Sequence, residues 1–117
     1  MEFKFTMNPY NQEGINNFFG VDYDSLKDDE KSLLEIAWDG WTVSEVNKII
    51  NKTKVLEGED FFDYIVEGSE LRISIDNEYV LFFDWRTEST EDDFRWSTAK
   101  FLNFMKSFRD FLKENGR

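Results

Sequence analysis

From residue 61 onward, apolar and polar positions alternate with a period of two, which is typical of β-strands. The pattern predicts three antiparallel strands, over residues 61–66, 71–75 and 78–85. Gly68-Ser69 and Asp76-Asn77 supply the turn residues between them. With two-residue loops, Tyr64 lies opposite Ile73, and Ile73 lies opposite Val80. The sequence therefore predicts a β-meander with a defined register.

This register assigns every strand side chain to one of two faces of the sheet, and a one-residue slip would exchange them. One face is apolar and must be covered: Phe62, Tyr64, Val66, Leu71, Ile73, Ile75, Val80 and Phe82. The other is mixed: Phe61, Asp63, Ile65, Arg72, Ser74, Tyr79, Leu81, Phe83 and Trp85. We expect the two N-terminal helices to cover the mixed face, although its aromatic side chains beside Arg72 would also suit a recognition surface.

The last part of the chain has a helical period of 3.6. Ser97 or Thr98 caps a helix over residues 98–114, and a short strand over residues 94–96 precedes it. The apolar positions recur at i, i+3, i+4 and i+7: Phe101, Leu102, Phe104, Met105, Phe108, Phe111 and Leu112. This stripe makes the helix the expected cover for the apolar face of the sheet.

Two further helices are predicted in the N-terminal half. Ser25 resembles the N-cap of a helix that ends at Asp39-Gly40, and Thr42 to Glu45 is a capping box for a second helix with lysines near its C-terminal end. A short strand is expected over residues 2–7. The fold class is α+β: one domain, residues 1–117, with a three- to four-stranded meander packed on the C-terminal amphipathic helix and two N-terminal helices.

The composition narrows the possible chemistry. The chain has no Cys and no His, which excludes disulfides, thiol nucleophiles, Ser-His-Asp chemistry and the usual zinc sites. We expect no cofactor, no metal and no enzymatic activity, because only carboxylate pairs or a Ser-Lys pair would remain. No apolar run approaches the roughly 18–20 residues of a membrane span, and the N-terminus does not resemble a signal peptide, so a cytoplasmic protein is expected.

Charge is concentrated in the same stretch as the strands. Residues 57–93 contain 13 Asp or Glu and two Arg, while the whole chain has a net charge of −11. Such a surface keeps an aromatic-rich protein in solution, or it attracts a basic protein; it repels nucleic acid and anionic membranes. The acidic candidates for contact with a partner are Glu57, Glu59, Asp60, Asp63, Glu67, Glu70, Asp76, Glu78 and Asp84.

Trp38 and Trp41 flank a turn and are two further candidates. They would anchor an interface, where Trp is favoured, or pack inward at a corner between helices. The polar side of the C-terminal helix is mildly basic and would either be solvated or pair with the acidic stretch of a second copy. The protein is therefore expected to be a monomer or a weak homodimer.

The chain resembles the immunity proteins of bacterial polymorphic toxin systems, including those of contact-dependent growth inhibition. The resemblance lies in size, acidity and aromatic content, in residues 67–83 and in residues 101–116. It implies a non-catalytic protein that binds one cognate toxin, expected to be a nuclease with a basic cleft, and occludes its active site or substrate surface. A small acidic secretion chaperone that binds an effector segment is the alternative.

Overall fold

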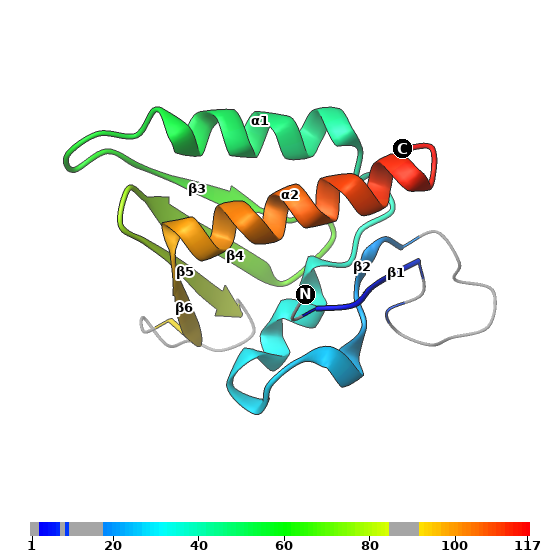
Figure 1. The fold of residues 1–117 in the computed structure, drawn as a ribbon. Coiled ribbons are helices and arrows are strands. Elements are labelled where there is room, and N and C mark those ends of the chain that lie inside the picture. The colour runs from blue at the N-terminus through cyan, green and yellow to red at the C-terminus, as the bar shows by residue number, and fades with distance from the viewer. Residues whose placement is uncertain (1–2, 8, 10–17, 85–91) are drawn as a thin grey trace.

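A computed structural model describes residues 3–7, 9, 18–84 and 92–117 of the chain. A four-stranded antiparallel sheet in the order β3-β4-β5-β6 lies at the centre of the fold (Figure 1). The strands are β3 (Phe61–Ile65), β4 (Leu71–Asp76), β5 (Tyr79–Asp84) and β6 (Phe94–Ser97). The α+β class and the predicted meander, including its short fourth strand, are confirmed. The acidic stretch 85–91, with Trp85, lies outside the described residues.

The register between β3 and β4 is as predicted, with Tyr64 opposite Ile73. The register between β4 and β5 differs, because Ile73 pairs with Phe82 and Ile75 pairs with Val80. Asp76 is the cause: its Oδ1 accepts hydrogen bonds from the backbone N–H groups of Glu78 and Tyr79 at 2.8 and 2.7 Å, so the loop is Asn77-Glu78. The shift is two residues, and each side chain therefore stays on its predicted face.

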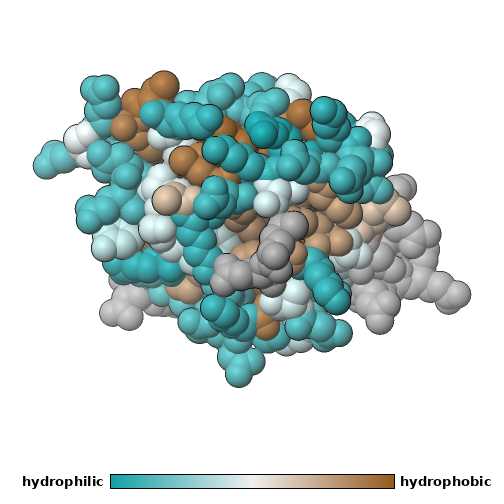
Figure 2. All heavy atoms as spheres, viewed as in Figure 1, coloured by the Kyte–Doolittle hydropathy of each residue, from teal (hydrophilic) through white to brown (hydrophobic). Residues whose placement is uncertain are grey.

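Both α-helices cover the apolar face of the sheet and lie side by side (Figure 1). Helix α2 (Thr98–Glu114), capped by Ser97, matches its prediction and lies over β5 and β6. Its Phe101 ring packs 6.2 Å from that of Phe82 on β5. Helix α1 (Val43–Lys54) lies over β3, where the Lys52 ammonium is 4.7 Å from the Phe62 ring centroid. In the view of Figure 2, hydrophilic residues cover most of this helix layer, and hydrophobic ones show between them.

The first predicted N-terminal helix is not an α-helix. The segment forms two 3₁₀-helices, η1 (Tyr23–Ser25) and η2 (Asp28–Ile36). Ser25 ends η1 and donates to the carbonyl of Asp22, so it does not cap η2, and the helix stops before Asp39-Gly40. The buried residues of η2 are spaced by three, as three residues per turn require: Glu30, Leu33 and Ile36. A helical pattern of apolar residues with a period of 3.6 predicts only apolar residues at buried positions. It therefore did not predict that the acid Glu30 lies in the core.

The N-terminal segment adds a small second sheet. Strand β1 (Phe5–Thr6) pairs with β2 (Gly20–Val21), which the sequence did not predict, and Phe19 forms an isolated bridge with Trp38. Phe3, 7% exposed, packs its ring edge-on against Phe104 of α2. The N-terminus therefore closes the core on the side of α2, and the predicted strand over residues 2–7 is real but shorter.

The mixed face of the sheet is not covered by the N-terminal helices, which corrects the expectation. Helix α1 joins α2 on the apolar face, and η2 contacts that face through the hydrogen bond from Trp96 Nε1 to Glu30. Among its described residues, three large hydrophobic side chains of the mixed face are exposed: Phe61 at 66%, Ile65 at 54% and Tyr79 at 42%. Within the part of the chain that the structure describes, no helix has the length and apolar character needed to cross a membrane.

Candidate partner-binding site

The sheet separates the acidic residues into two groups, one at each of its ends. Glu57, Glu59 and Asp60 precede β3 and lie at the end where Asp76 and Glu78 form the β4–β5 turn, because Phe61 pairs with Asp76. Glu67 and Glu70, in the β3–β4 turn, lie at the opposite end with Asp84. At about 3.4 Å per residue, the five residues of β3 hold the two groups roughly 17 Å apart. The candidates therefore do not form one continuous surface.

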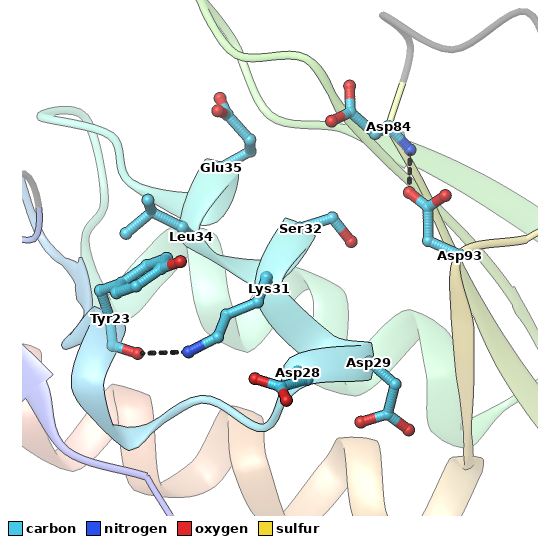
Figure 3. Close-up of a pocket in the computed structure, with 9 residues that line it drawn as sticks. All are labelled: Tyr23, Asp28, Asp29, Lys31, Ser32, Leu34, Glu35, Asp84 and Asp93. Atoms are coloured by element: carbon cyan, nitrogen blue, oxygen red, sulfur yellow. Dashed lines mark hydrogen bonds between the residues drawn. The ribbon is translucent and has the colours of Figure 1, made fainter.

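One member of the second group, Asp84, lines a pocket of about 450 Å³, shown in Figure 3. Asp84 at the end of β5 and Asp93 before β6 form one side, and residues of η2 form the other (Figure 3). The lining residues are Tyr23, Asp28, Asp29, Lys31, Ser32, Leu34, Glu35, Asp84 and Asp93. Five of these nine are carboxylates and one is a cation. We refer to this site as the acidic pocket.

Hydrogen bonds hold the two sides of the acidic pocket in place. The Ser69 hydroxyl in the β3–β4 turn donates to the backbone carbonyl of Glu35, which fixes η2 against the sheet. Asp93 Oδ2 accepts a hydrogen bond of 2.7 Å from the backbone N–H of Asp84. The three-residue period of η2 turns Glu30 inward and leaves Asp28 and Asp29 exposed. The pocket is thus built by tertiary contacts between segments about 50 residues apart.

Lys31 does not place its charge in the middle of these carboxylates. Its Nζ donates to the carbonyls of Leu26 at 3.0 Å and Tyr23 at 3.4 Å, and it lies 4.1 Å from the Tyr23 ring centroid. Figure 3 shows its side chain directed towards Tyr23, away from Asp84 and Asp93. The negative potential of the pocket is therefore only partly compensated by this lysine.

The two tryptophan candidates pack inward, with Trp41 in the core and the half-buried Trp38 against it. Trp41 is fully buried, and its Nε1 donates to the carbonyl of Ile36 at 2.8 Å. Its ring packs edge-on against Trp38 at 5.3 Å and stacks on Tyr64 at 5.8 Å. The structure therefore has the inward-packed arrangement of the two, in which Trp41 is inaccessible to a partner.

The remaining candidate, Asp63, lies on the mixed face of the sheet. It is exposed on β3, with Ser74 beside it on β4. Two cations of this face lie among the described residues, and each has an aromatic or acidic neighbour. The Arg72 guanidinium lies 4.4 Å from the Phe83 ring centroid, and Arg95 pairs with Asp92 at 2.8 Å. That ion pair raises the pKa of the Arg95 guanidinium. Asp63 is thus separated from both acidic groups and belongs to a different surface.

No group of three or more potential metal ligands occurs among the residues with described positions. The sequence did not predict that Glu35 lines this pocket, or that Asp28 and Asp29 lie at the same pocket as Asp84. A 3₁₀-helix that packs on the end of a sheet produces no periodic pattern in the sequence.

No protein-family model, no curated protein and no solved structure matches this chain.

Proposed function

We propose that this protein binds a basic partner protein and neutralises it, as an immunity protein does with its cognate toxin. The acidic pocket carries the proposal. Five carboxylates, from η2, the end of β5 and the residue before β6, line an open pocket large enough for the side chain of an arginine or lysine. The net charge of −11 adds a long-range attraction that would raise the association rate with a basic partner.

The pocket also offers a polar group without a partner. The Ser32 hydroxyl is buried and has no hydrogen-bond partner in the described part of the chain. In Figure 3 it points from η2 towards the side formed by Asp84 and Asp93. A guanidinium or ammonium group entering the pocket would donate to the hydroxyl and to the carboxylates together. Such charge-assisted hydrogen bonds are about twice as strong as neutral ones.

Inhibition would follow from occlusion. A toxin that acts on nucleic acid needs a basic surface for phosphates, and carboxylates that occupy this surface exclude the substrate. The fold suits this role because the carboxylates stand on a 3₁₀-helix and strand ends that are anchored to the core. No turnover is required of the inhibitor.

Co-expression tests this function. The protein is expressed together with the product of the neighbouring gene, and growth is compared with that of cells expressing the neighbour alone. Rescue of growth by the wild type, and loss of rescue when Asp28 and Asp29 are both changed to Lys, are expected. A neighbour that is toxic alone and equally toxic beside this protein would contradict the proposal.

The exposed mixed face favours a second candidate, a chaperone that holds an effector segment on an apolar surface. Phe61, Ile65 and Tyr79 would supply that surface. Salt separates the two functions. Binding to the acidic pocket weakens as ionic strength rises, because screening lengths fall to about 3 Å at 1 M salt, whereas apolar binding persists.

A further inference from the structure

We infer that the free edge of β3 is a strand-pairing site for an extended segment of a partner protein that carries Lys or Arg opposite Asp63. This inference concerns a surface other than the acidic pocket, and it does not require the partner to be a toxin. Three observations lead to it: the direction of the backbone groups of β3, the exposure of its side chains, and the position of one acid between them.

The backbone of β3 has hydrogen-bonding groups on its free side. In the order β3-β4-β5-β6, β4 is the only described strand that pairs with β3. Val66 N–H donates to the carbonyl of Leu71, so the even-numbered residues of β3 bond to β4. The N–H and C=O groups of Phe61, Asp63 and Ile65 therefore point to the open edge, where no described residue bonds to them. Such a row of groups is a template for a further strand.

The side chains at the same three positions lie on the mixed face and are exposed. Phe61 and Ile65, two residues before and after Asp63, are 66% and 54% exposed. An added strand would lay its own apolar side chains against these two and remove them from water. At about 25 cal/mol per Å² of buried apolar surface, this contact supplies affinity beyond that of the backbone hydrogen bonds.

Asp63 decides which strand is accepted. If two copies paired through β3 in antiparallel register, Phe61 would face Ile65 and Asp63 would face the same acid of the second copy. Like charges directly opposite are destabilising, so Asp63 opposes self-association of an otherwise apolar edge. A Lys or Arg at the opposing position would form an ion pair instead. The occupant is therefore an extended segment with a cation at its centre and apolar residues two positions away on either side.

The opposite edge of the sheet does not have these features. Strand β6 has four residues and leads directly into α2. Its central side chain on the mixed face is Arg95, which pairs with Asp92 at 2.8 Å. This ion pair already balances the charge of Arg95, so β6 offers no charge that would select an incoming strand. The asymmetry between the edges restricts the proposed site to β3.

The protein can supply its own probe for this site. An Asp63→Lys copy presents a basic strand with apolar neighbours, which is the chemistry of the proposed occupant. Sedimentation velocity is measured on the wild type, on the variant and on their equimolar mixture at low salt. Each protein alone is expected to sediment as a 14.0 kDa monomer, and the mixture is expected to show a doubling of mass.

Two controls identify the surface. An Asp110→Lys copy carries the same charge change on an exposed residue of α2, and its mixture with wild type is expected to stay monomeric. Adding Ile65→Pro to the Asp63→Lys copy removes one outward N–H and is expected to abolish the complex. Circular dichroism establishes that each variant is folded, and amide exchange at Asp63 and Ile65 of the wild type should slow at least tenfold in the mixture.

A folded mixture that remains monomeric with unchanged exchange at these amides overturns the inference. Association that also occurs with Asp110→Lys places the contact elsewhere and overturns it as well. A wild type that already dimerises through β3 would show that Asp63 does not select the occupant. None of these outcomes bears on rescue in the co-expression experiment, so the two proposals fail independently.

Discussion

The indole Nε1 of Trp96 on β6 donates a 2.7 Å hydrogen bond to Oε2 of Glu30 on η2, across 66 positions of sequence. Glu30 is 4% exposed, and the same oxygen lies 3.5 Å from the ammonium of Lys100. This buried contact joins η2 to the sheet and to α2. It therefore supports the segment that carries Asp28 and Asp29 at the acidic pocket.

Changing Glu30 to Ala is expected to lower the free energy of unfolding by about 2–4 kcal/mol, because the buried Trp96 N–H loses its partner and a small cavity forms. Glu30→Gln keeps an acceptor for Trp96 and supplies an amide beside the position of Oε1, which has no partner among the described residues. It should cost less than about 1 kcal/mol. Urea denaturation measures the free energy of unfolding of both variants. A Glu30→Ala variant as stable as Glu30→Gln would show that the hydrogen bond between Trp96 and Glu30 is dispensable.

Alkaline stability depends on Tyr64. Burial raises the pKa of its hydroxyl well above the ordinary value of 10.0, and the charge of Glu45, a hydrogen bond to Glu45 and the charge of Glu67 act in the same direction. The unfolded chain loses this proton near pH 10 while the folded chain keeps it. The stabilisation is therefore complete below pH 10 and is lost as the pH rises above it.

We expect Tyr64→Phe to flatten the fall in unfolding free energy between pH 10 and pH 12, as measured by urea titration at each pH. Tyr79→Phe is the matched control, because Tyr79 is exposed on the other face of the sheet. Equal slopes for the two variants would mean that Tyr64 is not the group responsible.

Gly40 leaves room for the indole of Trp38. A Cβ at position 40 would meet the six-membered ring of Trp38 closer than real Cβ atoms approach, and that ring packs against Trp41 at 5.3 Å. Gly40→Ala is expected to destabilise the fold by about 1–3 kcal/mol through this overlap. In a Trp38→Ala background the same change should cost about 0.5 kcal/mol or less, and full additivity in this cycle would exclude the overlap as the cause.

The acidic pocket and the acids that precede β3 predict different kinetics with a basic partner. Reversing Asp28 and Asp29 to Lys at the acidic pocket should slow association by about tenfold or more and reduce its salt dependence. Reversing Glu57 and Glu59 at the other end of the sheet makes the same change in total charge and should slow association less. Stopped-flow or surface-binding rates decide this, and equal effects would point to net charge alone.

The predicted register shows how far local patterns extend. The faces of the meander followed from the period of two, and they survived the two-residue shift at Asp76 because a shift by an even number preserves them. The shift itself depended on the Asp76 side chain accepting two backbone hydrogen bonds, which the composition of the turn did not specify. The period of 3.6 located α2 from Thr98 to Glu114 for the same local reason.

By itself the sequence determined the elements with a strong period: the strands of the meander, α1 and α2, and the apolar face that α2 covers. These depend on neighbours two to four residues away. The tertiary structure decided that α1 lies beside α2, that η2 buries Glu30 against Trp96, and that the acids divide into two groups. It also left β3 with an exposed face and a free edge. These features depend on contacts between distant segments, for which a single chain carries no repeating signal.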